Sequence, residues 1–248
     1  MSTDNSLSVV IPAKDEAGNI GQLVTEIHQV LRDYPHYEVV VVDDGSDDHT
    51  LETARRTAEA LHCPFQGLRH EYSIGQSGAL LTGIRAATGA LIVTMDGDGQ
   101  NDPTDIPEML RLAQSYRGRD FCINGFRINR RDTTWKRLQS RLANRIRSTL
   151  LGDGIPDSGC GLKLFPKATF LKLPWFDHGH RFLPALVKGI GGDLDMVVVN
   201  HRERRSGRSN YNAWNRAWAG LLDLAGVMWL LHRTRVAQVQ TQTGPESR

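Results

Sequence analysis

The stretch YEVVVVDDGS at residues 37–46 decides the fold class of this chain. Its unbroken run of valines is typical of a strand that is covered on both faces, and the polar residues after it are typical of a turn. The runs LSVVIPAKDE at residues 7–16 and ALIVTMDGDGQ at residues 90–100 have the same form. The apolar residues between these runs recur at helical spacing. The alternation predicts an α/β fold with a mostly parallel, Rossmann-like sheet and helices on both faces.

The expected elements continue this alternation, and no linker near residue 103 divides the chain into separate domains. We expect strands at residues 7–13, 37–46, 65–70, 90–96, 120–127, 161–165 and 194–202. We expect helices at residues 19–32, 51–61, 78–87 and 135–151, the last of them basic. The pattern in the second half of the chain is the less regular one.

The composition narrows the class of protein. A chain of 248 residues with 40% hydrophobic residues and a net charge of +2 fits one globular domain. Cys63, Cys122 and Cys160 form no C-x-x-C pair, which argues against a disulfide framework or a zinc site and suits a reducing compartment. The N-terminus lacks the segments of a signal peptide, so we expect a cytoplasmic protein. We expect the polar tail at residues 236–248 to be disordered.

Charged residues follow three of the expected strands, and the carboxyl ends of parallel strands share the edge where ligands of open α/β folds bind. The residues that we expect to converge there are Lys14, Asp15, Glu16, Asp43, Asp44, Asp96 and Asp98. Aspartates two positions apart can offer oxygens to Mg²⁺ or Mn²⁺, which would bring bound phosphates with it. Asp43 and Asp44 could instead accept hydrogen bonds from a ribose or a base. The simpler alternative is that Asp and Gly only form turns after strands.

Two common nucleotide motifs are absent: no G-x-G-x-x-G follows the first strand, and no P-loop occurs. The motifs that are present are VVIPAKDEAGNI (9–20), VVVVDDGSDDHT (39–50), GQSGALLTGIRAATGALIVTMDGDGQNDP (75–103) and HRERRSGRSNY (201–211). Together they resemble the family-2 glycosyltransferases, and within them the polyprenyl-phosphate group of the dolichol-phosphate mannose synthases. The resemblance runs from about Leu7 to Tyr211.

This resemblance implies a glycosyltransferase A fold and an inverting, metal-dependent transfer of one sugar to a dolichyl or undecaprenyl phosphate, with mannose from GDP-mannose as the leading donor. The residues implied at the nucleotide are Pro12, Ala13, Asp15 and Glu16, with Asp43 or Asp44 also on the nucleoside. Those implied at the Mg²⁺ or Mn²⁺ ion and the sugar diphosphate are Asp96, Asp98 and Gln100. Gly97 stands where the family often has Ala, and we expect it to make the turn more flexible.

Basic residues gather at 127–147 and at 202–208. For most of residues 130–147 a solvated helix face is the favoured interpretation, and nucleic acid is disfavoured because no basic-aromatic module is present. The resemblance implies that Arg127, Arg141, Arg204 and Ser209 hold the acceptor phosphate, for which guanidinium forks are well suited. It also places Asp157 and Lys163 in a family motif, with Lys163 where relatives often have Arg. For His180 and Arg181, near the implied acceptor, structural and functional interpretations have equal weight.

A phosphate acceptor is already ionised at neutral pH, so we assign no general base. The residues that we expect to carry catalysis are Asp98, Gln100, Arg127, Arg141 and Arg204. The alternatives are a family-2 transferase that uses a UDP-sugar or another acceptor, and a non-catalytic scaffold that binds nucleotide sugars.

The segment at residues 211–235 carries Trp214, Trp218 and Trp229 at helical spacing, but Asp223 interrupts its apolar part. That part falls short of the roughly 20 residues that a membrane span needs. We expect an amphipathic helix in the membrane interface, with a core helix packed on the domain as the alternative. The catalytic domain is then residues 1–210. We expect it to work at the cytoplasmic face of a membrane, in peripheral contact, and a membrane-protein partner or a homo-oligomer is possible.

Overall fold

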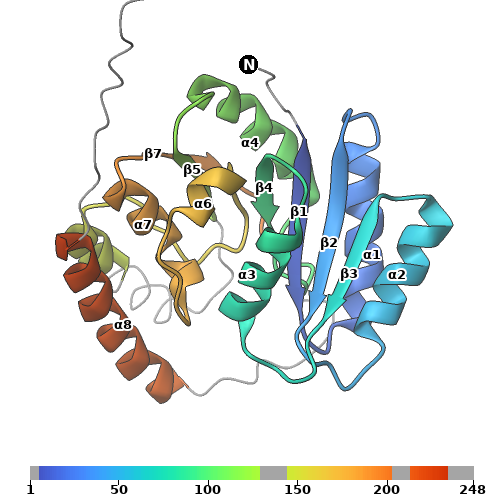
Figure 1. The fold of residues 1–248 in the computed structure, drawn as a ribbon, viewed down its shortest axis with the longest axis horizontal. Coiled ribbons are helices and arrows are strands. Elements are labelled where there is room, and N and C mark those ends of the chain that lie inside the picture. Colours follow the sequence, from blue (N-terminus) through green and yellow to red (C-terminus); the bar gives the residue numbers. More distant parts are fainter. Residues whose placement is uncertain (1–5, 129–143, 203–212, 234–248) are drawn as a thin grey trace, which may run out of the picture.

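The computed structural model describes residues 6–128, 144–202 and 213–233. Within these residues one sheet contains seven strands in the order β3-β2-β1-β4-β6-β5-β7 (Figure 1). The strands are β1 (Leu7–Ala13), β2 (Tyr37–Asp43), β3 (Phe65–Arg69), β4 (Leu91–Thr94), β5 (Phe121–Phe126), β6 (Lys163–Pro166) and β7 (Asp193–Val198).

The strands β1 and β2 lie inside the sheet because their side chains are apolar on both faces. β1 pairs in parallel with β2 on one side, where Val9 lies opposite Val39, and in parallel with β4 on the other. Every residue of β1 is buried, and so are the valines at positions 39–42 of β2. A strand that is apolar on both faces needs a layer on each side, as the valine run predicts.

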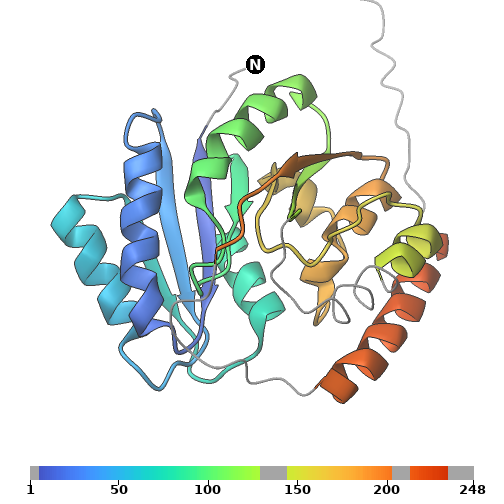
Figure 2. The same cartoon turned by 180° about the vertical axis from the view of Figure 1, so that it is seen from behind.

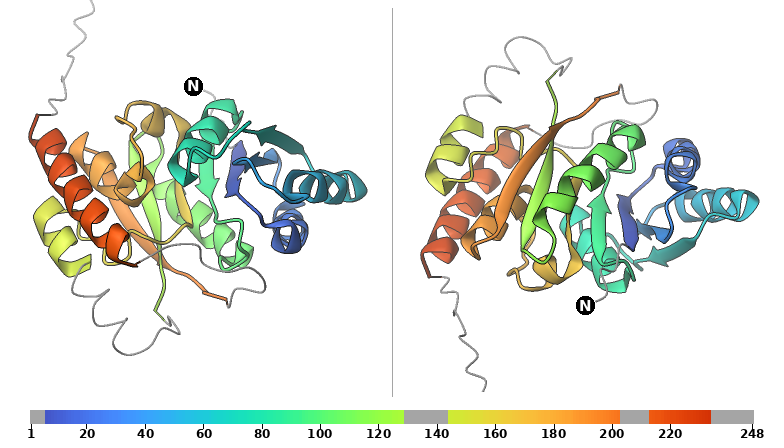
Figure 3. Two further views of the ribbon diagram at one scale, coloured as in Figure 1. Left: turned by 90° about the horizontal axis from the view of Figure 1, so that it is seen from below. Right: turned by 90° about the horizontal axis from the view of Figure 1, so that it is seen from above.

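Two layers of helices supply this cover (Figures 2 and 3). The helices on one face are α1 (Ala17–Leu31), α2 (Thr50–Leu61) and α4 (Ile106–Ala113). Those on the other face are α3 (Gln76–Ala86), α6 (Lys167–Leu171) and α7 (Leu183–Gly189). The short 3-10 helices are η1 (Pro103–Asp105), η2 (Gln114–Tyr116) and η3 (Gly179–Arg181). A last helix, α8 (Ala213–Arg233), packs on α7.

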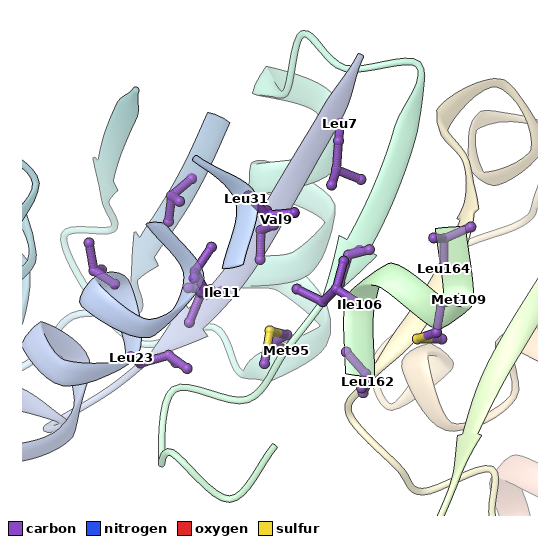
Figure 4. Packing of buried hydrophobic residues seen from close by; sticks show 14 of the residues in the cluster. Leu7, Val9, Ile11, Leu23, Leu31, Met95, Ile106, Met109, Leu162 and Leu164 are labelled. Atoms are coloured by element: carbon purple, nitrogen blue, oxygen red, sulfur yellow. The ribbon is translucent and has the colours of Figure 1, made fainter. Parts of the chain in front are cut away.

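The larger core lies between the sheet and the layer of α1 and α4 (Figure 4). Its members labelled there are Leu7, Val9, Ile11, Leu23, Leu31, Met95, Ile106, Met109, Leu162 and Leu164. Burying one such side chain stabilises the fold by about 1.5–3 kcal/mol. This core holds β1 beside β4, and the residues that follow these two strands therefore share one edge of the sheet.

The predicted α/β fold is confirmed, with one reversal of direction in the sheet. β6 runs antiparallel to β4 and to β5, whereas the other strand pairs are parallel. β2 and β4 end at Asp43 and Thr94, earlier than predicted, because the polar residues after them form loops. The sequence did not predict α4, α6 and α7, which have 8, 5 and 7 residues and are too short to show a clear helical period.

The C-terminal helix α8 lies where the sequence predicts a helix. Its Val227 is buried and Leu231 lies against Gly189 of α7, whereas Leu222 and Trp229 are 73% and 63% exposed. In the described parts of the chain, no helix combines the length and apolar character that crossing a bilayer requires. Of the predicted basic helix at 135–151, residues 144–151 are helical and the remainder lies outside the described residues.

Candidate active site

The loops after β1 and β2 are joined at the carboxyl edge of the sheet. Asp44 N donates to Ala13 O at 2.8 Å, and Asp15 N donates to Ser46 Oγ at 3.0 Å. The Asp15 carboxylate accepts from Asp47 N at 2.8 Å, and Asp15 has a positive φ of 55°. The structure therefore brings the first two acidic motifs together, and Asp15 is one of the residues that connects them.

Three further predicted nucleotide residues, Pro12, Ala13 and Glu16, belong to the same junction. Glu16 precedes α1, where its N–H donates to Thr50 Oγ1 at 2.8 Å and its carboxylate accepts from Asn19 Nδ2 at 2.5 Å. Pro12 and Ala13 are buried at the end of β1. Pro12, Ala13 and Glu16 thus each have a structural role in the protein. Their roles at the nucleotide stay predictions.

Asp43 is buried and paired within the protein. Its carboxylate accepts from Ser46 N at 2.8 Å and from Arg69 Nη1 at 3.0 Å. Arg69 in turn donates to Ser46 O at 2.8 Å. Asp43 therefore stabilises the DDGS turn itself, which is what the turn alternative predicts.

The carboxylate of Asp44 holds the segment that leads into α3. It accepts from His70 Nδ1 at 2.8 Å, Ser73 Oγ at 2.7 Å, Ile74 N at 2.9 Å and Gly75 N at 2.9 Å. Burial would raise the pKa of Asp44, but these hydrogen bonds, led by that from His70, lower it overall. Asp44 is ionised at neutral pH and its oxygens already have four donors.

Asp96, in the loop after β4, has a different environment. Its Oδ1 accepts from Gln76 Nε2 at 2.7 Å, and its N–H donates to Asn101 Oδ1 at 3.0 Å. Burial and then the charge of Asp98 raise the pKa of Asp96 to about 6, although the cations Lys163 and Arg127 act in the opposite direction. The Asp96 and Asp98 carboxylates are thus close enough to repel each other.

Two glycines make room for this loop. A Cβ on Gly161 would lie 2.2 Å from Asp96 Oδ2, so the carboxylate rests directly against the backbone there. A Cβ on Gly97 would lie 3.2 Å from both the Ala13 Cβ and the Pro12 carbonyl oxygen. Gly97 is therefore packed tightly against the end of β1, and the expectation that it makes the turn more flexible stays a prediction.

The residues of this loop fit a divalent cation of the Mg²⁺ or Mn²⁺ type. Two carboxylates that repel each other gain from a cation between them, and both lie on one short loop. Gln100 donates its backbone N–H to Asp98 Oδ1 at 3.1 Å, while its side-chain Nε2 is 3.5 Å from Arg202 O. In the described residues no cluster of three or more His, Cys, Asp or Glu side chains forms a metal cage. Mg²⁺ usually needs no such cage, because waters and substrate phosphates complete its shell.

The predicted acceptor residue Arg127 is paired with Asp157. Arg127 Nε and Nη2 donate to Oδ2 and Oδ1 of Asp157 at 2.7 and 2.8 Å. Burial would lower the pKa of Arg127, but the Asp157 carboxylate raises it, so this guanidinium stays charged. Arg127 lies near enough for its charge to act on Asp96. The predicted phosphate residues Arg141, Arg204 and Ser209 lie outside the described residues.

Several residues around the loop were not identified from the sequence as site residues. The guanidinium of Arg202 forms ion pairs with Asp102, at 2.7 Å, and with Glu26. The backbone N–H of Arg202 donates to the carbonyl oxygen of Gln100 at 3.0 Å. This joins the aspartate loop to the start of the arginine-rich segment. Gln76 is also new; it lies in the stretch 75–103 that carries the resemblance, two residues before the helix expected at 78–87.

Lys163 and His180 line the same small cavity as Asp96. Lys163 is 4% exposed and donates to Cys160 O, and burial lowers its pKa. His180 Nδ1 lies 2.7 Å from Ser77 Oγ, and burial lowers the pKa of His180 well below its usual value. The charge of Lys163 lowers the pKa of Asp96, and His180 contacts Ser77 in the helix α3 that also carries Gln76.

Residues 8–173 match the family described as glycosyl transferase family 2. The chain belongs to this family. The family comprises glycosyltransferases, so the predicted enzyme class is confirmed.

Two curated relatives are named for polyprenyl-phosphate substrates. The dodecaprenyl-phosphate galacturonate synthase of Rhizobium johnstonii is 34% identical over 91% of this chain and 67% of its own length. The undecaprenyl-phosphate 4-deoxy-4-formamido-L-arabinose transferase of Pseudomonas paraeruginosa is 32% identical over 84% of this chain. The chain spans only 60% of that second relative.

Two solved structures of other proteins share the fold. Glucosyl-3-phosphoglycerate synthase from Mycobacterium tuberculosis, in complex with Mn²⁺, UDP-glucose and glycerol 3-phosphate, has a TM-score of 0.64 at 18% identity, over 92% of this chain and 80% of that one. Mannosyl-3-phosphoglycerate synthase from Rubrobacter xylanophilus has a TM-score of 0.63 at 16% identity, over 97% of this chain and 79% of that one. At these identities the likeness concerns the fold, and it confirms the predicted glycosyltransferase A architecture.

Proposed function

We propose that this chain transfers one sugar from a nucleotide-sugar donor to a polyprenyl phosphate, with inversion at the sugar and with Mg²⁺ or Mn²⁺ bound. The observation that carries the proposal is that an acidic pair of residues and an arginine lie near each other at one edge of the sheet. The repelling carboxylates Asp96 and Asp98 suit a cation with a diphosphate, and the largely buried, permanently charged Arg127 next to them suits a second phosphate. The names of the relatives indicate that this second phosphate is a polyprenyl phosphate.

On the donor side, Asp96, Asp98 and Gln100 would hold the cation, and the residues implied at the nucleotide are Pro12, Ala13, Asp15, Glu16, Asp43 and Asp44. The cation, when bound, would neutralise charge that develops on the departing nucleotide diphosphate. Asp44 contributes by holding the segment before α3 in place, and Asp15 by joining the loops after β1 and β2. Glucosyl-3-phosphoglycerate synthase from Mycobacterium tuberculosis was crystallised with Mn²⁺ and also with Mg²⁺, which supports a divalent cation in this fold.

On the acceptor side, Arg127 would orient the phosphate, together with Arg141, Arg204 and Ser209. The acceptor oxygen is ionised at neutral pH, so it can form the bond to the sugar while the bond to the nucleotide diphosphate breaks on the opposite side. No group has to remove a proton, and correct positioning can supply most of the rate. The Asp157 fork keeps the Arg127 guanidinium in one orientation, which is what such positioning requires.

Mannose from GDP-mannose is the donor predicted by resemblance, but the two relatives are named for galacturonate and formamido-arabinose. The deciding experiment supplies purified chain and Mn²⁺ with GDP-mannose, UDP-glucose, UDP-galacturonate and UDP-formamido-arabinose in turn. Each donor is given with no acceptor, with a short polyprenyl phosphate or with 3-phosphoglycerate, and nucleotide diphosphate release is measured. We expect release from one donor that depends on the polyprenyl phosphate. Release that depends on phosphoglycerate, or no release from any donor, would overturn the proposal.

We also propose that the chain works at the cytoplasmic face of a membrane, with α8 in peripheral contact, alone, as a homo-oligomer or with a membrane-protein partner. The exposed Leu222 and Trp229 of α8 support this, since Trp is favoured at the membrane interface. In this division of the chain, residues 1–210 are the catalytic domain and residues 211–235 the interface helix. Flotation with anionic vesicles tests the contact: Trp229→Ser should reduce the bound fraction, and equal binding would contradict it.

A further inference from the structure

The first turn of α3 makes a direct contact with the aspartate loop. Gln76 is the first residue of α3, and its Nε2 donates to Asp96 Oδ1 at 2.7 Å. Because the Gly161 backbone lies against the other oxygen, Asp96 Oδ2, the carboxylate is held from two sides. This contact matters because the Asp98 charge pushes the Asp96 carboxylate away from the arrangement that a shared cation needs.

The next residue fixes this turn of α3 to a distant segment. Ser77 is buried; its Oγ lies 2.7 Å from His180 Nδ1, and its carbonyl oxygen accepts from Trp175 Nε1 at 2.9 Å. His180 belongs to η3, which precedes α7. The turn is also fixed on its other side, since Asp44 accepts from Gly75 N at 2.9 Å. The helix start that carries Gln76 is therefore anchored at the two residues that flank Gln76.

A small cavity, with room for roughly one water molecule, lies between these groups. Gln76, Asp96, Lys163 and His180 are among the residues that line it. His180 and Asp96 thus line the same small cavity.

We propose that Gln76 is a positioning residue for Asp96, and that His180 keeps Gln76 in place through Ser77. This inference rests on the proposed function, because it takes Asp96 as a cation ligand. By holding Asp96 Oδ1, Gln76 keeps the carboxylate oriented in the free protein. The cation then binds to a loop that is already arranged, and the cost of ordering that loop is not subtracted from the affinity.

The test is a calorimetric titration of Mn²⁺ into the full chain without any donor, with thermal unfolding measured for each variant. Gln76→Ala should weaken Mn²⁺ binding about tenfold, since it removes one hydrogen bond to a charged group. His180→Ala should weaken binding in the same direction, and His180→Asn, whose amide can still meet Ser77, should recover most of the loss. The matched control is His178→Asn, two residues away, which should leave Mn²⁺ affinity unchanged.

A second readout separates positioning from general damage. In the transferase assay, Gln76→Ala should need more Mn²⁺ for half of its maximal rate, and saturating Mn²⁺ should bring its rate close to that of the unmodified chain. Mn²⁺ affinity equal to that of the unmodified chain in Gln76→Ala would overturn the inference and leave the proposed function intact. Equal affinity in Asp96→Asn would instead remove Asp96 from the cation site, and the inference with it.

Discussion

Two pairs of aspartates flank β1 at the same edge of the sheet, and the sequence presents them in much the same way. Asp43 and Asp44 follow β2, whereas Asp96 and Asp98 follow β4. The first pair is satisfied by donors from the protein, and hydrogen bonds lower the pKa of Asp44 in spite of its burial. In the second pair, burial and mutual repulsion raise the pKa of Asp96 to about 6.

The difference shows what distinguishes a structural carboxylate from one that awaits a ligand. Asp43, Asp44 and Asp98 are buried and Asp96 is partly exposed, so exposure alone does not explain why the raised pKa lies in the second pair. The number of hydrogen-bond donors separates the two pairs. Four donors reach the Asp44 carboxylate, whereas among the described hydrogen bonds one donor, from Gln76, reaches the Asp96 carboxylate. A charge that the protein stabilises only in part is a candidate for a functional site.

The largest expected difference between the pairs is in activity. Asp96→Asn and Asp98→Asn should each reduce transfer by about a hundred- to a thousandfold, because the loop loses a charged oxygen where the diphosphate charge develops. Neither change should lower the melting temperature, since each one removes repulsion. Donor-dependent release of nucleotide diphosphate and thermal unfolding test this together. Activity within tenfold of the unmodified chain would place the cation elsewhere.

The opposite pattern is expected at Asp44. Asp44→Ala leaves the donors of His70, Ser73, Ile74 and Gly75 without their acceptor and should lower the free energy of unfolding by about 3 kcal/mol. Urea denaturation measures this loss. Asp47→Ala is the matched control, because Asp47 is exposed on the same turn and should change stability little. Equal stability of the two variants would mean that the Asp44 carboxylate does not stabilise the fold.

The pH dependence of stability should also have opposite signs. The folded pKa of Asp96, about 6, lies above the ordinary value of 3.8, so the folded chain keeps a proton that the unfolded chain has released. The proton on Asp96 therefore contributes to the free energy of unfolding. This contribution is fully present below pH 3.8 and is lost as the pH rises through 6. The lowered pKa of Asp44 acts the other way, giving stability that is lost as pH falls.

Urea denaturation in a chelator measures the Asp96 contribution as the difference between the unmodified chain and Asp96→Asn. From pH 4 to pH 7 the unmodified chain should lose on the order of 2 kcal/mol relative to this variant. The comparison with Asp96→Asn removes the other titrating groups, which both proteins share. A difference that does not change with pH would show that Asp96 titrates normally.

The sequence predicted the shared form of the two pairs but not their difference. Strand runs that end in Asp and Gly are local patterns, so the sheet edge and its acidic residues could be predicted from short stretches. The groups that distinguish the pairs come from far along the chain: His70 for Asp44, and Gln76 and Gly161 for Asp96. The antiparallel direction of β6 likewise depends on pairing between distant segments, which no local period encodes. The role of Arg127 was implied by resemblance, whereas its fork with Asp157 needed the structure.

The smallest expected effect concerns the space beside Asp96. In Gly161→Ala the new methyl group would occupy the position of the Asp96 carboxylate, with Oδ2 only 2.2 Å from it, so the carboxylate must move and loses its hydrogen bond from Gln76. We expect Mn²⁺ binding to weaken about tenfold, with a modest loss of stability. Gly159→Ala controls for the loop itself, because its methyl group would lie 3.9 Å from Arg127 Nη2, an ordinary contact. Calorimetry on the two variants decides the matter, and equal affinities would mean that Asp96 binds the cation from a position other than the one that Gln76 and Gly161 define.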